Sequence, residues 1–405
     1  MRRTRPTDSS GPGRALQALG IGLLAVALAG CSSSGSTTSS ASSAASAPAP
    51  APSDSAQSST DQPQSGFLAG LHTTSTVAST IPENLDVNPY AVTVATTTAG
   101  KITKGDVLVD NFNSKANFQG TGTTIVQIDP QGQLTTFAQI PANQPGCPGG
   151  IGLTTAMTEL ASGYVIVGSA PSTDGTTATQ GAGCLLVLNP QGQVASTIQG
   201  GDLDGPWDLT ATDQGSTATL YVTNTLHGIQ AVGQPVQQAG TVVRVQLNEP
   251  ADAAPTVTSE TVIGSGFPEQ ADANTFVDGP TGLALGTDGT LYVADRLGNR
   301  IAAIPQAATR SDSAGTGTTL TSGGRLDGPL SMALAPNGDL LVANGLNGQL
   351  VEVTTTGKQV ANTWLDQDPA QTPAGSGDLF GIAVTADHSG VYFAMDDNNA
   401  LGVIK

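Results

Sequence analysis

The fold of this 405-residue chain is clearest in the sequence Gly279-Pro-Thr-Gly-Leu-Ala-Leu-Gly-Thr-Asp-Gly-Thr-Leu-Tyr-Val-Ala-Asp-Arg-Leu-Gly-Asn-Arg-Ile301. Two short apolar runs flank an Asp-Gly pair, which is typical of a tight turn because glycine accepts a positive φ. Another apolar run begins at Ile301, after a second group of polar and glycine residues. The stretch therefore predicts two antiparallel strands joined by a turn, with a third strand starting at its end.

Softer copies of this pattern recur on both sides of it. Each copy begins at a corner rich in Gly, Pro and Asp, and its second strand ends, in most copies, in Asp or Asn. Equivalent positions such as Gly279 and Gly328, or Asp295 and Asn344, are 49 residues apart. This period is typical of a four-stranded propeller blade. Six copies begin near Asn88, Gly150, Asp204, Gly279, Asp327 and Gly377.

The last copy ends at Lys405 after only three strands, so its blade lacks an outer strand. The β-prone segment Thr73–Ile81 precedes the first copy and has no partner of its own. We predict that it closes the ring as the outer strand of the sixth blade, because this removes an exposed sheet edge. The predicted fold class is therefore all-β, a six-bladed β-propeller over residues 67–405. No long segment after residue 35 has apolar residues at helical spacing.

Residues Gly279–Ile301 resemble the NHL repeat, since Pro, Gly-Leu-Ala, Asp-Gly, Leu-Tyr-Val-Ala-Asp and Asn-Arg-Ile follow one another in its order. The fifth and sixth copies match more weakly, and the first three match only in outline. The resemblance implies a six-bladed propeller of the NHL or senescence-marker-protein/gluconolactonase kind. This architecture hosts many functions, so the resemblance indicates a fold and not one activity.

The N-terminus predicts export. Four arginines precede the short apolar run Ala15–Ala29, and this pattern is typical of a signal peptide at residues 1–30. The sequence Leu28-Ala29-Gly30-Cys31 resembles a bacterial lipobox, which implies lipid attachment to Cys31 and cleavage before it. An ordinary signal peptide with a coincidental cysteine is the alternative. The resemblance implies an extracytoplasmic lipoprotein anchored to the cell membrane or the outer membrane.

Residues 31–66 are almost entirely Ser, Ala, Thr, Pro, Gln and Gly. A segment of this composition cannot bury enough apolar surface to fold, so it is predicted to be a disordered tether between the lipid and the propeller. Two further cysteines, Cys147 and Cys184, lie in the second repeat. An exported protein meets an oxidising compartment, so we predict a disulfide between them; two unpaired thiols are the alternative.

Charge restricts the possible partners. Only 11% of the residues are charged, and the net charge is -18. Nucleic-acid phosphates require clustered Lys and Arg, so no nucleic-acid partner is expected. The acidic chain is compatible with cations or basic partners, or its charge serves solubility alone. We expect a monomer.

Candidate ligand residues lie where strands begin or end on one face of the predicted propeller. One group precedes the innermost strands and the other follows the second strands. They are Asn111, Asp204, Trp207, Asn224, Asp278, Asp295, Asp327 and Asn344. Carboxylate and amide oxygens suit Ca²⁺, and the metal candidates are Asp204, Asn224, Asp295 and Asn344. The alternative is structural, because Asp and Asn also cap corners and make side-chain turns.

Trp207 is a candidate for stacking on a sugar or an aromatic ligand, or else a packed blade residue. The gluconolactonase-like and paraoxonase-like families hold a catalytic Ca²⁺ and often have Asn before the Gly-Leu-Ala motif. This chain has Thr281, Ser331 and Phe380 at the matching positions. We therefore predict a membrane-tethered scaffold that binds a ligand or a protein. A Ca²⁺-dependent lactonase-like hydrolase is the alternative, and catalytic residues are not assigned.

Overall fold

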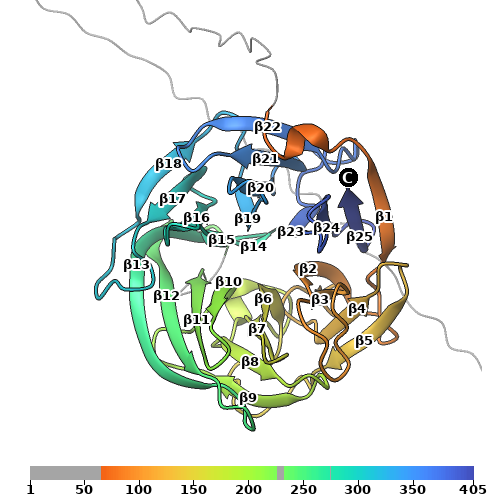
Figure 1. The fold of residues 1–405 in the computed structure, drawn as a ribbon, viewed down its shortest axis with the longest axis vertical. Coiled ribbons are helices and arrows are strands. Elements are labelled where there is room, and N and C mark those ends of the chain that lie inside the picture. Colours follow the sequence, from red (N-terminus) through yellow and green to blue (C-terminus); the bar gives the residue numbers. More distant parts are fainter. Residues whose placement is uncertain (1–64, 226–231, 274) are drawn as a thin grey trace, which may run out of the picture. The chain divides into compact units, whose positions relative to one another are not determined.

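The repeats form six antiparallel sheets arranged around a common centre, as Figure 1 shows. The computed structural model describes residues 65–225, 232–273 and 275–405. The predicted signal peptide, the predicted lipidation site Cys31 and nearly all of the predicted tether lie outside the described residues. The predicted all-β six-bladed propeller is confirmed.

Each blade is an antiparallel sheet whose strands are ordered outward from the centre; five blades have four strands, and the third has a short fifth strand. The innermost strands are β2 (Val87–Val94), β6 (Leu153–Glu159), β10 (Pro206–Asp213), β15 (Pro280–Leu285), β19 (Pro329–Leu334) and β23 (Leu379–Val384). The second strands are β3 (Val107–Asn113), β7 (Val165–Ser169), β11 (Thr217–Asn224), β16 (Leu291–Asp295), β20 (Leu340–Asn344) and β24 (Val391–Met395).

The outer half of each blade carries its third and fourth strands. The third strands are β4 (Thr124–Ile128), β8 (Cys184–Leu188), β12 (Gln237–Asn248), β17 (Arg300–Ile304), β21 (Gln349–Val353) and β25 (Ala400–Ile404). The fourth strands are β5 (Leu134–Gln139), β9 (Val194–Ile198), β13 (Thr256–Asp272), β18 (Thr318–Ser322), β22 (Gln359–Trp364) and β1 (Thr74–Ser79). Two short 3₁₀ helices, η1 (Leu68–Gly70) and η2 (Thr177–Thr179), are the helices of the described chain. None of its helices has the length and apolar character that crossing a membrane requires.

Strand β1 closes the ring, as predicted. It pairs antiparallel with β25, so that Thr74 lies opposite Ile404 and Ser79 lies opposite Ala400. The first described strand is therefore the outer strand of the sixth blade, whose other three strands are the last three strands of the chain. This pairing gives β25 a neighbour on both sides and removes the open edge.

The third blade is larger than its sequence indicated. Its third strand, β12, is 12 residues long and its fourth, β13, is 17 residues long, whereas most strands of the other blades have five or six. The three-residue strand β14 (Phe276–Asp278) pairs with the end of β13. Gly264, Gly266 and Pro268 interrupt the apolar pattern of β13, and register shifts along the β12–β13 ladder accommodate them. Irregular pairing of this kind is not visible in local periodicity.

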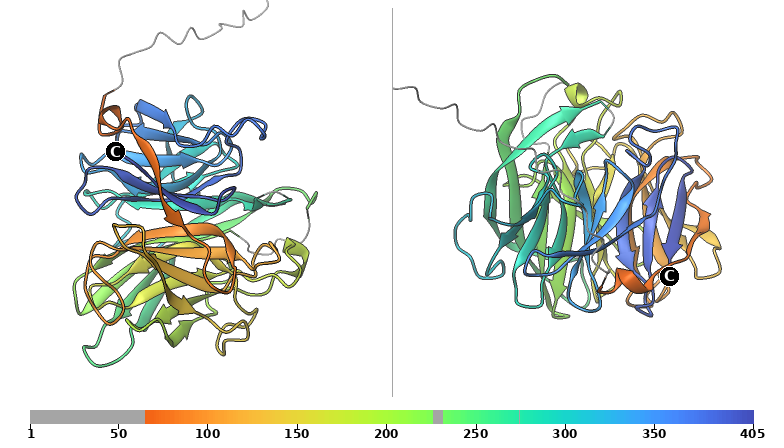
Figure 2. Two further views of the ribbon diagram at one scale, coloured as in Figure 1. Left: turned by 90° about the vertical axis from the view of Figure 1, so that its right-hand side faces the viewer. Right: turned by 90° about the horizontal axis from the view of Figure 1, so that it is seen from above.

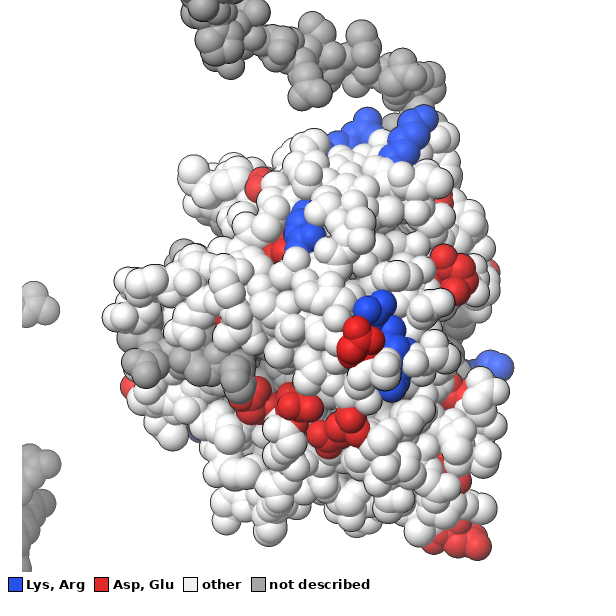
Figure 3. All heavy atoms as spheres, turned by 90° about the vertical axis from the view of Figure 1, so that its left-hand side faces the viewer, with Lys and Arg blue, Asp and Glu red and all other residues white. Residues whose placement is uncertain are grey.

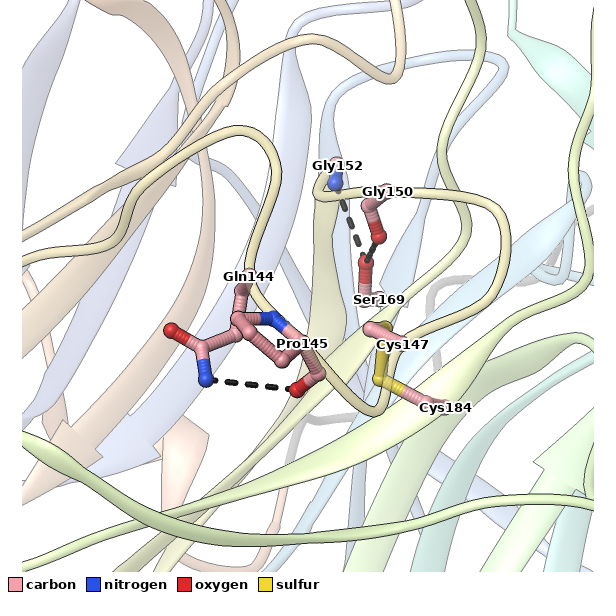
Figure 4. The surroundings of a disulfide bond; sticks show 7 residues. All are labelled: Gln144, Pro145, Cys147, Gly150, Gly152, Ser169 and Cys184. Atoms are coloured by element: carbon pink, nitrogen blue, oxygen red, sulfur yellow. Dashed lines mark hydrogen bonds between the residues drawn. A yellow bond between two sulfur atoms is a disulfide. The ribbon is translucent and has the colours of Figure 1, made fainter.

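The disulfide is present, as predicted. Cys147 and Cys184 are joined, with their Cα atoms 5.5 Å apart (Figure 4). Cys147 lies in the segment between β5 and β6, and Cys184 is the first residue of β8. Both cysteines are buried in the apolar cluster between the first two blades. The bond therefore attaches a long connecting segment to the blade that follows it.

Strand direction defines two faces of the propeller. The innermost strands all begin at what we name the upper face and end at the lower face. The upper face comprises residues 80–86, 114–123, 140–152, 170–183, 199–205, 232–236, 275–279, 296–299, 323–328, 345–348, 365–378 and 396–399. The lower face comprises residues 95–106, 129–133, 160–164, 189–193, 214–216, 249–255, 286–290, 305–317, 335–339, 354–358 and 385–390. In the right view of Figure 2, η2 (yellow) and η1 (orange) lie at opposite edges, on the sides of the upper and lower faces respectively.

Candidate functional site

An aromatic cluster fills the centre of the propeller near its upper face. Tyr90 stacks on Phe112 and Phe380, with ring centroids 4.4 and 4.3 Å apart. Trp207 meets the edges of Tyr90 and Phe112 and stacks on Phe276 at 6.3 Å. All five side chains are buried. Trp207, our candidate for stacking on a ligand, is only 1% exposed and belongs to this core, so a ligand cannot reach its ring without displacing its neighbours.

Asparagines at the ends of the second strands bond to the connecting segments that lead into their own blades. The side-chain amides donate to backbone carbonyls: Asn111 to Thr80 at 3.0 Å, Asn224 to Asp202 at 3.0 Å and Asn344 to Arg325 at 2.8 Å. All three side chains are fully buried. The repeated bond holds the corner against the end of the strand. This agrees with the structural role predicted from the sequence as the alternative to ligand binding. Ser169 occupies the equivalent position in the second blade, and its hydroxyl accepts from the Gly152 N–H at 3.0 Å.

Asp295 occupies the same position in the fourth blade. Its carboxylate accepts from the Arg300 Nε at 2.8 Å and from the Gly298 N–H at 3.0 Å. Asp295 is 1% exposed, so its ion pair is largely shielded from water. Both partners belong to the turn and strand that follow Asp295, and they stabilise the β16–β17 hairpin.

The aspartates that precede the innermost strands are more accessible. Asp204 and Asp327 are partly exposed. Asp278 forms an ion pair with Arg296, and it accepts from the Thr275 hydroxyl at 3.2 Å. Arg296 is buried, so this pair links the corner before β15 to the end of β16.

The four metal candidates do not bond to a common centre. Asn224, Asp295 and Asn344 each use their side chains within their own blade or its leading segment. Among residues 65–225, 232–273 and 275–405, no group of three or more His, Cys, Asp or Glu side chains is arranged to hold a metal ion. Ca²⁺ binding by Asp204 and these three residues stays a prediction.

Carboxyl groups crowd the upper face between the fifth and sixth blades. Burial raises the pKa of Asp378 to about 7, and the neighbouring carboxylates of Asp397, Asp366 and Asp396 add to the rise. Burial also raises the pKa of Asp396 to about 7, with a further contribution from Asp397. Moving these carboxyls out of water and beside one another disfavours their charged form.

Large apolar side chains are exposed mainly at the upper face. Eight are exposed in the described chain, and seven of them lie in upper-face segments or at the upper end of β22. They are Ile81, Leu85, Phe118, Val232, Val236, Leu346 and Trp364. The eighth, Val257, lies near the lower end of β13. Leu85 is 54% exposed and Phe118 is 51% exposed, so about half of the surface of each residue is presented to solvent.

Acidic side chains accompany these apolar residues. Those exposed or partly exposed on or next to the upper face are Glu83, Asp174, Asp202, Asp204, Asp272, Asp278, Asp327, Asp366, Asp368, Asp396 and Asp397. The basic side chains that reach solvent on or next to the upper face are Lys115, Arg300 and Arg325. The lower face also carries accessible acidic side chains, and there Lys101, Lys104, Arg310 and Lys358 accompany them. Figure 3 shows a rim of the propeller on which most of the surface is uncharged.

Sequence reasoning missed the aromatic cluster, although a signal was present. Tyr90, Trp207 and Phe380 are all the second residue of the apolar run that opens a repeat. Equivalent positions of different blades meet at the centre of a propeller, so bulky residues there predict a filled channel. Phe112 and Phe276 lie outside that alignment, and only the tertiary structure brings them in.

No protein-family model and no curated protein matches the sequence. Solved structures do match. A luciferin-regenerating enzyme is 12% identical, with a TM-score of 0.51, over 82% of this chain and 95% of its own. A gluconolactonase from Xanthomonas campestris is 12% identical, with a TM-score of 0.49, over 82% and 88%. The regucalcin of Agrobacterium tumefaciens is 13% identical, with a TM-score of 0.49, over 80% and 92%.

Identities this low establish a likeness of fold and of nothing else. The six sheets and their strand order show by themselves that the chain has a six-bladed β-propeller fold.

Proposed function

We propose that this protein is a membrane-tethered, extracytoplasmic binding scaffold whose upper face docks a basic protein segment that carries apolar side chains. The observation that supports the proposal is the distribution of exposed large apolar residues, nearly all of which lie at the upper face. Exposed apolar residues gathered on one face are typical of protein-binding surfaces, whereas scattered ones need no explanation.

The charge of the upper face indicates that its partner is basic. Acidic side chains surround the apolar residues, and few basic side chains offset them. The acidic side chains would attract a partner that has Lys or Arg beside its apolar residues. Once bound, the apolar residues of this partner would cover the exposed apolar side chains of the upper face. An acidic partner would be repelled.

The contacts beneath the upper face suit a rigid platform. The buried asparagines hold its corners, and the aromatic cluster supports its centre. A rigid surface loses little conformational entropy on binding. The first described residue lies at the lower side of the propeller, where the Ser65 N–H donates to the Val360 carbonyl at the lower end of β22.

The experiment uses the purified full-length protein and two synthetic peptides. One peptide alternates Leu and Lys, and the other has Glu in place of Lys. We expect the basic peptide to bind with an affinity that falls as salt is added, and the acidic peptide not to bind. Phe118→Ser should weaken binding of the basic peptide about tenfold or more, because it removes an exposed apolar contact.

Val257→Ser is the matched control, since Val257 is an exposed apolar residue away from the upper face. It should leave peptide binding unchanged. Equal effects of the two substitutions, or no binding of the basic peptide, would overturn the proposal. A lactone hydrolysis assay tests the alternative: robust turnover that a chelator abolishes would favour the Ca²⁺-dependent hydrolase.

A further inference from the structure

A cavity of roughly 700 Å³ occupies the lower half of the central channel. All six innermost strands line it, from the middle of each strand to its lower end. One lining residue from each blade, in chain order, is Val94, Thr155, Thr210, Leu285, Ala333 and Ala383. Small-molecule sites in proteins have volumes of about 300–1,000 Å³, so this cavity can hold such a ligand.

The aromatic cluster closes the upper end of this cavity. Trp207 directly precedes the lining residue Asp208, and Phe380 directly precedes the lining residue Gly381. Both aromatic rings are buried in the central core. The cavity therefore opens at the lower face, away from the upper-face surface proposed above.

The walls of the cavity are aliphatic side chains and hydroxyl groups. Leu, Val, Ala, Met and Thr dominate the lining, and no Phe, Tyr or Trp of the described chain belongs to it. The innermost strands are also the edge strands of their sheets. An edge strand presents unpaired backbone N–H and C=O groups, which can bond to a ligand. The lining thus combines apolar contact with neutral donors and acceptors.

Three lining residues are titratable, and none places a free charge deep in the cavity. Asp208 accepts from the backbone N–H groups of Leu209 at 2.8 Å and Leu283 at 3.0 Å, and burial raises its pKa well above the usual range. Lys104 and His388 are exposed at the lower opening. Carboxylates close to that opening offset them, since Glu159 bonds to the lining residue Thr96 and Asp387 precedes His388.

We propose that this cavity binds an uncharged small molecule with a largely aliphatic body and a few hydroxyl or carbonyl groups. The aliphatic body packs against the Leu, Val, Ala and Met side chains. The polar groups bond to threonine hydroxyls and to those backbone groups of the innermost strands that no neighbouring side chain already satisfies. A charged head group has no buried counter-charge here, and desolvating it would oppose binding.

The first test measures binding of a neutral fluorescent probe, 1-N-phenylnaphthylamine, to the full-length protein. We expect a saturable rise in fluorescence. Ala383→Trp fills the cavity and should abolish the rise, whereas Ala253→Trp, at an exposed position on the lower face, should not change it. Ala333→Met adds less volume and should weaken binding even if Ala383→Trp fails to fold. An unchanged response in Ala333→Met and in folded Ala383→Trp would overturn the proposal.

The second test sets the ligand class by displacing the probe with octanol, octanoate and octylamine. These share one aliphatic chain and differ in head group. Octanol should displace the probe at a concentration about tenfold lower than either ion. Stronger displacement by octanoate or octylamine would contradict the uncharged-ligand assignment, and the absence of any probe binding would contradict the site itself. Phe118→Ser should leave probe binding unchanged, so the outcome is separable from that of the docking surface.

Discussion

Asp208 in the third blade accepts the backbone N–H of Leu283 in the fourth blade, with 3.0 Å between Oδ2 and the nitrogen. Similar side-chain bonds join other neighbouring blades near the centre. Hydroxyl groups donate across blade boundaries to backbone carbonyls: Thr93 to Met157 at 3.0 Å, Thr154 to Pro206 at 3.0 Å, Thr223 to Thr281 at 2.9 Å and Thr281 to Pro329 at 3.3 Å. These bonds satisfy backbone groups on strand edges that no neighbouring strand pairs.

Asp208→Ala should lower the free energy of unfolding by about 1–3 kcal/mol, because it leaves two buried N–H groups without their acceptor. Asp208→Asn should also destabilise, since its amide NH₂ would face one of those N–H groups. Asp110→Asn is the matched control: Asp110 Oδ1 accepts from the Ala91 N–H at 2.8 Å, which an asparagine oxygen can retain. Urea denaturation measures all three, and equal effects at the two positions would contradict this account.

Stability should fall as pH rises from about 4 to about 8. Burial raises the pKa of Asp110 to about 8, and the pKa values of Asp378 and Asp396 to about 7. The folded state therefore keeps protons in this range that the unfolded state has lost, and the slope reaches about 1.4 kcal/mol per pH unit for each retained proton. Above pH 8 this contribution is gone. Urea midpoints at pH 5, 6, 7 and 8 should decline for the wild type and decline less for Asp110→Asn. Midpoints that rise with pH would refute the prediction.

Deleting residues 1–79 should destabilise the propeller by about 3 kcal/mol or more. It removes β1 from the edge of β25 and also removes Leu68 and Leu71, which are buried in the core between the fifth and sixth blades. Deleting residues 1–64 is the control, because it keeps every described residue. Thermal unfolding and gel filtration compare the two, and the longer deletion should also promote association through the open edge. Identical melting temperatures would argue against β1 as a stabilising strand.

The disulfide should contribute about 3–4 kcal/mol, as expected for a bond that closes a loop of 37 residues in the unfolded chain. A variant with both Cys147→Ser and Cys184→Ser should unfold at a lower urea concentration. Wild-type protein treated with a reductant should behave like this double variant, whereas the variant itself should not respond to reductant. Stability that is the same with and without the bond would contradict the prediction.

Glu352 should hold the segment before β1 in place. Its buried carboxylate accepts the backbone N–H groups of Phe67 at 2.8 Å and Leu68 at 2.7 Å, and the Asn337 amide at 2.7 Å. Glu352→Gln places an NH₂ against one of these donors, so hydrogen exchange of residues 65–71 should accelerate about tenfold, which corresponds to about 1.4 kcal/mol.

Glu159→Gln is the control for Glu352, because Glu159 also accepts a backbone N–H, from Thr96, and lies in a different blade. It should leave exchange at residues 65–71 unchanged. If both substitutions accelerate exchange there, the effect is general and the contact of Glu352 is not its cause.

Much of the architecture follows from local sequence. The Asp-Gly turn, the short apolar runs and the 49-residue repeat are all visible in the sequence, so the blades and their number could be predicted. The role of Thr73–Ile81 could be predicted as well, because a three-stranded last blade leaves an edge that needs a partner. The pairing of Cys147 with Cys184 could be predicted from two cysteines in one repeat of a chain that the N-terminal sequence predicts to be exported.

The six-bladed fold, its closure by an N-terminal strand and the disulfide could all be predicted from local sequence. Which end of the channel is open depends on how the blades pack together. Tyr90, Phe112, Trp207, Phe276 and Phe380 are distant in the chain, and only packing around a common axis makes them a core that closes the upper end. The same packing brings the side-chain amides of Asn111, Asn224 and Asn344 into hydrogen bonds with nearby backbone carbonyls. Both outcomes depend on distances between blades, which no local pattern of residues encodes.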